Sequence, residues 1–280
     1  MLLRGMVSSI AFAAVMIAGP VAAQQGVDPG KYPNMAGQWQ RVGPLGAYDN
    51  TKPPARGQQA PYTPEYEAIF EANLAEVKQG KSGEDPVHTC IPEGMPRAMT
   101  LVLPMEVVIT PNTTYMLMEY LSMLRRIYTD GRDFPKDEDP SWMGYSIGKW
   151  LDEDGDGRFD VLEVETRNLK LPRTFDPSGL PVHRDGQMVI KERFYLDKTN
   201  QDVLYDQITT MDHSLTRPWT IVRTMKREKK PIWVESICSE GNVHVMIGGE
   251  HYMLGGDDLL IPFYKGQPAP DLKHFQQGAK

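Results

Sequence analysis

The sequence predicts a mainly β protein: an antiparallel up-and-down barrel of lipocalin-like architecture, or a strongly curled sheet, with one N-terminal helix. From residue 105 onward, runs rich in Val, Ile, Tyr, Thr and Trp alternate with period two, and short turn sequences separate them. The chain shows no strand–helix–strand alternation, which argues against a doubly wound fold. Eight or nine antiparallel strands joined by short hairpins close readily into a barrel.

The chain begins with the features of a secretory signal peptide, predicted over residues 1–23. Arg4 provides a positive charge, residues 10–18 form an apolar core, and residues 21–23 are small, as at a cleavage site. This apolar stretch is shorter than the ~20 residues that a membrane helix needs, and no later segment approaches that length. We therefore expect a periplasmic or secreted protein without a transmembrane segment, with 280 − 23 = 257 mature residues.

Residues 24–62 are rich in Pro, Gly and Gln and are predicted to form an irregular lead-in, anchored to the core by Trp39. A helix follows over residues 63–80. Thr63 is suited to the N-cap, Pro64 to the first helical position, and Gly80 to the end of the helix. Apolar side chains recur at helical spacing: Tyr66, Ile69, Phe70, Leu74 and Val77.

Residues 81–280 are predicted to form one antiparallel β domain. Alternating runs and the turns between them place its strands. The expected strands are 105–110, 115–120, 123–128, 145–151, 161–167, 188–196, 203–211, 219–227 and 232–236.

An acidic loop over residues 152–163 matches the twelve-position calcium motif D-x-[DN]-x-[DN]-G-x5-E at every specified position. Ca²⁺ takes six to eight oxygen ligands, and such a loop supplies them in order. Gly157 provides the sharp turn at position 6. The alternative is an acidic, solvated turn that binds no ion. The predicted ligands are Asp152, Asp154, Asp156, the carbonyl of Arg158, Asp160 through water, and Glu163.

The segments on either side of this loop favour strands. Gly144 and Gly148 precede the loop, and residues 161–166 alternate after it. We therefore place the loop at the tip of a β-hairpin. A lone calcium loop on a β scaffold fits a structural clamp better than a sensor, because there is no pair of helices to open.

The chain has two cysteines, Cys90 and Cys238. In an oxidising compartment they most simply form one disulfide, which would close a loop of about 150 residues. Two buried free thiols are the alternative.

The charge pattern and the histidine spacing give no support to two classes of function. The formal net charge is −7, and no Lys/Arg cluster is long enough to bind nucleic acid. No His-Glu-x-x-His or His-x-His spacing occurs, so the sequence gives no support for a zinc site. Calcium is thus the only cofactor that the sequence predicts.

The region from Cys90 to Cys238 resembles a large group of uncharacterised exported bacterial proteins of β-rich structure. The resemblance covers roughly 150 of the 257 mature residues and implies export and a β-rich body, but no particular activity. It also implies that the acidic loop is an insertion at a turn that is short in the group. The motifs that carry it are CIPEGMPR (90–97), RRIYTDGR (125–132), PSWMGYSIGKW (140–150), LEVET (162–166), ERF (192–194), TRPWT (216–220) and ESIC (235–238).

The predicted strands contain more charge than a purely structural barrel needs. If these residues faced inward, they would suggest a ligand or a catalytic role; if they faced water, they would serve only solubility. A general base at the rim, His213 beside Asp212, is a further possibility, although a loop His beside a turn Asp is the commoner arrangement. The candidate catalytic residues are Glu119, Arg126, Tyr128, Glu192 and Asp212.

Three functions fit these observations. The first is an exported, calcium-stabilised barrel that binds a small, largely apolar or aromatic molecule. The second is an enzyme that acts on such a molecule inside the barrel by general acid–base chemistry, as a lyase, isomerase or hydrolase. The third is a structural envelope protein with a packed barrel. A cavity of several hundred Å³ with convergent polar groups would exclude the third function.

Overall fold

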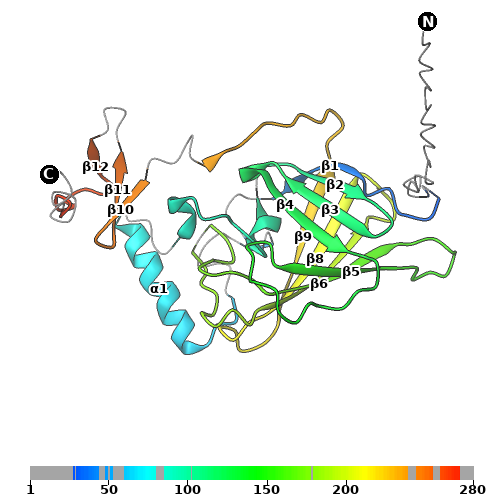
Figure 1. Ribbon diagram of the computed structural model, residues 1–280, viewed down its shortest axis with the longest axis horizontal. Helices are drawn as coiled ribbons and strands as arrows, with labels where there is room; N and C mark the ends of the chain where they lie inside the picture. Colours follow the sequence, from blue (N-terminus) through cyan, green and yellow to red (C-terminus); the bar gives the residue numbers. More distant parts are fainter. Residues whose placement is uncertain are drawn as a thin grey trace, which may run out of the picture.

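A computed structural model describes residues 28, 30–43, 48–49, 51–52, 60–79, 85–101, 103–177, 179–238, 244–254 and 259–271. Its main feature is a closed barrel of nine strands in chain order, β1 to β9 (Figure 1). The predicted signal peptide lies outside the described residues. The barrel strands are β1 (Gly37–Val42), β2 (Met105–Ile109), β3 (Thr113–Met118), β4 (Met123–Tyr128), β5 (Tyr145–Leu151), β6 (Val161–Arg167), β7 (Val189–Leu196), β8 (Val203–Met211) and β9 (Trp219–Arg227).

The strand count imposes one departure from the predicted up-and-down order. Neighbouring strands of a closed barrel can all run antiparallel only if their number is even, so nine strands require one parallel pair. That pair is β4–β5, whose register joins Ile127 to Ser146 and Tyr128 to Ile147. The segment 129–144 carries the chain back between these strands, as a parallel connection requires.

Strand β1 closes the barrel, so the lead-in predicted for residues 24–62 is not irregular throughout. It pairs with β2 on one side and β9 on the other, and Trp39 lies opposite Met105 and Arg227. The predicted anchoring role of Trp39 is confirmed, because its side chain is buried and its indole N–H donates to the Met35 carbonyl at 2.8 Å. The strand was missed because only Trp39 and Val42 are large and apolar in its six residues.

The predicted helix is present as α1 (Pro64–Lys78). The Thr63 hydroxyl accepts the N–H of Tyr66 at 3.4 Å, as expected of an N-cap. Tyr66 and Phe70 are buried, and α1 lies outside the barrel (Figure 1). Three short 3₁₀ helices accompany it: η2 (Pro86–Thr89), η3 (Arg97–Thr100) and η4 (Tyr120–Ser122).

A second, three-stranded sheet follows the barrel. Its strands are β10 (His244–Ile247), β11 (Glu250–Leu254) and β12 (Leu260–Pro262). The strand expected at 232–236 is wrong, because this segment joins no β-ladder. It follows Pro231, and Ile232, Trp233 and Val234 point into solvent, although Gln38 donates a side-chain hydrogen bond to the Ile232 carbonyl at 3.0 Å.

The predicted disulfide is confirmed. Cys90 and Cys238 are bonded, with their Cα atoms 5.6 Å apart. The bond joins the end of η2 to the chain that leads from the barrel to the second sheet.

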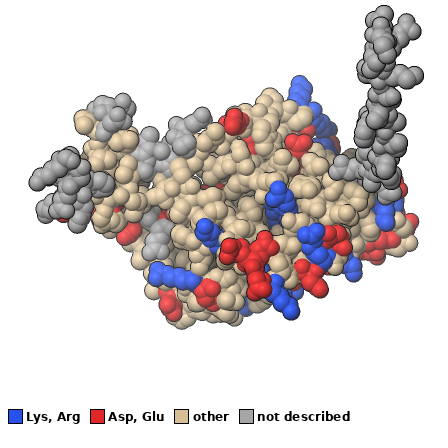
Figure 2. Space-filling view, in the orientation of Figure 1, with Lys and Arg blue, Asp and Glu red and all other residues tan. Residues whose placement is uncertain are grey.

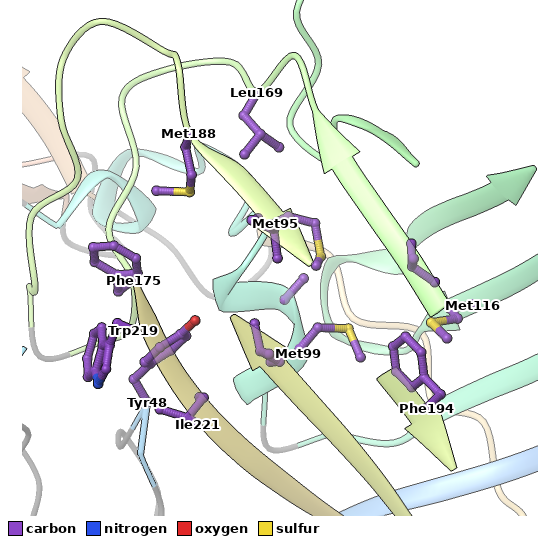
Figure 3. Packing of buried hydrophobic residues seen from close by; sticks show 14 of the residues in the cluster. Tyr48, Met95, Met99, Met116, Leu169, Phe175, Met188, Phe194, Trp219 and Ile221 are labelled. Atoms are coloured by element: carbon purple, nitrogen blue, oxygen red, sulfur yellow. The ribbon is translucent and has the colours of Figure 1, made fainter. Parts of the chain in front are cut away.

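Side chains fill the barrel interior (Figure 3). Tyr48, Phe175 and Trp219 form an aromatic group at one end, with the Tyr48 and Trp219 ring centroids 4.7 Å apart. Met99, carried by η3, and Met116 are buried further along. A cavity of about 20 Å³ remains beside Trp39 and Met99, enough for about one water molecule.

We expect replacement of both cysteines by serine, Cys90→Ser/Cys238→Ser, to lower the free energy of unfolding by about 2–5 kcal/mol. The physical reason is the long loop that the bond closes in the unfolded chain, 148 residues in sequence separation. Urea unfolding of both proteins without reductant measures the difference. Equal midpoints would contradict the expectation.

Candidate functional site

The acidic loop, residues 152–163, connects β5 to β6, as predicted. These strands pair antiparallel up to Leu151 and Val161, and the loop continues beyond that last pair. Acidic side chains crowd at the tip of this hairpin, at the right edge of Figure 2. The loop is therefore the tip of a β-hairpin and not the link between two helices.

Three carboxylates of the acidic loop converge. One oxygen each from Asp152, Asp154 and Asp156 lies within 4.8 Å of the others, and all three residues are exposed. Asp152 accepts the N–H groups of Gly155 at 2.8 Å and Gly157 at 2.9 Å. Both glycines have positive φ, +76° and +88°, so the chain turns where other residues would be strained. Three like charges this close favour a cation between them.

The remaining predicted ligands lie elsewhere. Asp160 accepts the N–H of Glu153 at 2.9 Å and is not part of the three-carboxylate cluster. Glu163 forms an ion pair with Arg193 at 2.5 Å, and the other end of the same guanidinium binds Glu153 at 2.6 Å. The N–H of Arg158 donates to a carboxylate of the cluster at 2.8 Å. The structure thus brings three of the six predicted ligands together.

The position of Glu163 follows from the strand that carries it. In a helix–loop–helix site, the twelfth residue lies at the start of a helix, which returns its side chain to the ion. Here β6 begins at Val161, so extended backbone carries Glu163 along the outer face of the barrel, opposite Arg193 of β7. Glu163 must leave Arg193 if it is to complete the site.

Aromatic side chains anchor the acidic loop at its base and line a groove of about 900 Å³ beside it. Tyr32 packs edge-on against Trp150 and Phe159, with ring centroids 5.3 Å and 5.2 Å away. Tyr195 of β7 and Tyr205 of β8 also line the groove, and their ring centroids are 5.3 Å from each other. The loop is therefore attached to packed structure at its base, while its acidic tip remains accessible.

The barrel interior holds a buried ion pair between Arg125 of β4 and Glu192 of β7. Both side chains are about 1% exposed or less. The guanidinium donates to both carboxylate oxygens, at 2.9 Å for the Nη1–Oε1 bond. It also donates to Thr166 at 2.9 Å and to Ser146 at 3.3 Å. This pair is well satisfied, as a buried pair must be to avoid a net desolvation cost.

A second buried carboxyl, Asp206 of β8, has no hydrogen-bond partner among the described residues. Burial raises the pKa of Asp206 well above its ordinary range, and the nearby charge of Glu192 adds to the rise, while Arg125 and Arg223 oppose it. Arg223, opposite Asp206 on β9, donates to the Tyr48 carbonyl. Asp206 therefore retains its proton at pH values where a solvated aspartate is ionised.

The five candidate catalytic residues do not form one site. Glu192 faces inward and forms an ion pair with Arg125, while Arg126 and Tyr128 are on the outward side of β4. Glu119 is buried in the turn between β3 and β4, and Asp212 lies in the turn after β8. Alternation along β4 separates Arg125 from Arg126. The sequence could not show which of the two faces inward.

A cluster of His183, Asp185 and His213 was missed by the sequence analysis. One ligand atom from each lies within 4.8 Å of the others. Asp185 binds the Nδ1 atoms of both imidazoles, at 3.0 Å for His183 and 2.5 Å for His213. Burial acts to raise the pKa of Asp185, but hydrogen bonds from the Gln187 N–H and the two imidazoles outweigh it and lower the pKa to about 2. The hydrogen bond to Asp185 raises the pKa of His213.

A cleft of about 800 Å³ lies outside the barrel, between α1, the segment 171–184 and the second sheet. Its volume is within the range of small-molecule sites. Apolar and aromatic side chains form much of its wall: Tyr66, Ile69, Leu171, Val182, Met246 and Phe263.

Arg173 is a buried cation at the wall of this cleft. It donates to the carbonyls of Lys170 at 2.7 Å and Trp142 at 3.3 Å, and also to that of Met95. Among the described residues no acidic side chain pairs with Arg173, and burial alone lowers its pKa to about 9. Asp85, which also lines the cleft, is paired with Arg97 at 2.8 Å.

No protein-family model matches this chain, and no curated protein matches it significantly in sequence. None of the helices in the described ranges is both long and apolar enough to cross a bilayer. The disulfide is consistent with an extracytoplasmic, oxidising compartment.

We expect Arg125→Met to lower the free energy of unfolding by about 3–5 kcal/mol, because it leaves Glu192 as a buried carboxylate without its partner. Its matched control is Arg126→Met, the adjacent and exposed position on β4, which should change stability by no more than about 0.5 kcal/mol. Chemical unfolding of both variants tests this. Similar losses in the two variants would show that Arg125 has no special role.

Proposed function

We propose that the protein is an exported, calcium-stabilised β-barrel. The observation that carries the proposal is the convergence of the Asp152, Asp154 and Asp156 carboxylates at the tip of the β5–β6 hairpin. Oxygen ligands of this kind suit Ca²⁺, which accepts flexible geometry and completes its shell with carbonyls and water. The next ligands in this proposal are the carbonyl of Arg158 and, through a water molecule, Asp160. Glu163 would join them after its ion pair with Arg193 breaks.

The ion acts as a clamp in this proposal. The hairpin has no helices to reorient, so binding has no two-state element to switch. The bound ion reduces the repulsion between the carboxylates of the acidic loop. It also holds the turns of the loop against the aromatic side chains at its base, Tyr32, Trp150 and Phe159. An exposed site with three convergent carboxylates suits the weaker affinities of extracellular calcium modules, with Kd on the order of 10⁻⁴–10⁻³ M.

We expect Ca²⁺ at a hundredfold excess over Kd to raise the free energy of unfolding by about 2.7 kcal/mol. Asp152→Asn/Asp156→Asn should abolish this increase. The same variant should be more stable than the unsubstituted protein in chelator, because it removes part of the repulsion between the carboxylates. Thermal unfolding with calcium and with chelator measures both effects.

The control for this experiment is Asp137→Asn, which changes an exposed acid outside the loop. It should keep the full calcium response. An unchanged melting temperature with calcium, together with no bound calcium by elemental analysis, would refute the clamp.

The second candidate function is binding of a small, largely apolar or aromatic molecule. Because side chains fill the barrel interior, the external cleft offers more room for such a ligand. Its walls are apolar and aromatic, and Arg173 adds a buried positive charge without an acidic partner among the described residues. A small carboxylic acid with an apolar or aromatic body combines the two features that this cleft would recognise.

We expect 1-naphthoate to bind in the cleft and its uncharged amide to bind about tenfold more weakly, because the amide lacks the charge that complements Arg173. Ile69→Trp should block binding, since Ile69 of α1 lines the cleft. Fluorescence titration measures these affinities.

The control is Val77→Trp, on the same helix but exposed and outside the cleft. It should bind as the unsubstituted protein does. Equal affinities for acid and amide, or no effect of Ile69→Trp, would refute this assignment.

The enzyme alternative has less support, because its candidate residues are dispersed over the inner face, the outer face and the end of the barrel. Membership of the exported bacterial group that the motifs resemble remains a proposal. It agrees with the disulfide between Cys90 and Cys238, which stand in two of those motifs.

A further inference from the structure

The cluster of His183, Asp185 and His213 is assembled by the pairing of β7 with β8. Val189 at the start of β7 lies opposite Met211 at the end of β8. The turn before β7 and the turn after β8 must therefore meet at one end of the barrel. The first turn carries His183 and Asp185, and the second carries His213.

The hydrogen bonds of this cluster point to a cation. The backbone N–H of Asp185 lies 3.3 Å from Nδ1 of His183 and donates to it whenever that nitrogen carries no proton. A carboxylate oxygen of Asp185 lies only 3.0 Å from the same nitrogen. Two acceptor atoms at this distance repel each other unless a proton or a metal ion lies between them. The same carboxylate also faces the imidazole of His213.

We propose that His183, Asp185 and His213 form a binding site for a divalent transition metal of the zinc class. Two imidazole nitrogens and one carboxylate are the protein ligands of many zinc sites, with water at an open fourth position. The same set also suits Fe²⁺ or Co²⁺, whereas Ca²⁺ prefers a shell of oxygen atoms. The side chains of His183 and Asp185 are about one-third exposed and that of His213 more, so an ion can enter.

Neighbouring contacts hold the turn that carries His183. Asp212 accepts the backbone N–H of His183 at 2.9 Å and that of Ser214 at 2.9 Å, which joins the two turns. The Tyr66 ring packs against the His183 ring with centroids 5.2 Å apart, and its hydroxyl accepts the N–H of Arg184 at 3.3 Å. Such surrounding contacts fix the orientation of metal ligands before the ion arrives.

This site is separate from the acidic loop. β7 runs from Val189, beside the histidine cluster, to Leu196, beside the base of the loop. Eight residues of strand span about 25 Å. The two sites therefore lie toward opposite ends of the barrel and differ in ligand chemistry, so calcium and zinc should bind independently.

The test is isothermal titration of the full mature protein with Zn²⁺ while excess Ca²⁺ occupies the acidic loop. We expect one zinc ion per chain. His213→Ala should weaken binding by at least about 100-fold, because even the loss of a partner outside the ligand shell costs about 10–100-fold. His213 is largely exposed, so this substitution should leave the fold intact.

Two control variants and an independent probe sharpen the result. His88→Ala removes a histidine outside the cluster, and Asp152→Asn removes an acid of the calcium loop; both should keep the zinc affinity. Co²⁺ should give a visible absorption spectrum that His183→Ala and His213→Ala abolish. Equal zinc affinity in the unsubstituted protein and in His213→Ala, or no zinc binding at all, would overturn the proposal.

Discussion

The side chain of Arg125 holds the barrel together where its backbone pairing is weakest. An odd number of strands requires one parallel pair, and that pair, β4–β5, is joined over only two register positions. From β4, Arg125 reaches Ser146 on β5, Thr166 on β6 and Glu192 on β7. One guanidinium thus links four consecutive strands across this seam. The buried charge serves closure of the barrel, and the other strands can then follow in simple antiparallel order.

The same strand order sets the two candidate metal sites apart. From β5 to β9 the strands are antiparallel, so successive connections lie at alternating ends of the barrel. The β5–β6 loop therefore lies at one end, and the turn before β7 and the turn after β8 lie at the other. One end presents oxygen ligands suited to calcium, and the other presents imidazoles beside a carboxylate. Buried side chains fill the part of the interior that Figure 3 shows.

Elements that depend on a short stretch of sequence could be predicted. Elements that depend on the pairing of distant segments could not. Period-two alternation predicted β2 to β9, the N-cap at Thr63 predicted α1, and the loop motif predicted three carboxylates that do converge. The parallel β4–β5 pair is required by the odd number of strands in the closed barrel, and the sequence of neither strand indicates it. The histidine cluster joins residues 28 positions apart, and only the β7–β8 register brings them together. The short spacing of His183 and Asp185 was its one local signal.

The disulfide shortens the free segment of chain that connects the second sheet, β10 to β12, to the barrel. Without it, the chain from Arg227 to His244 is 17 residues long and could extend about 60 Å. With Cys238 fixed to Cys90, only six residues remain, with a reach of about 20 Å. The sheet, whose strand β10 contacts η2, is thereby kept at a high effective concentration beside the cleft that it helps to form. One wall of the cleft is therefore held in place by a bond that exists only in the oxidised protein.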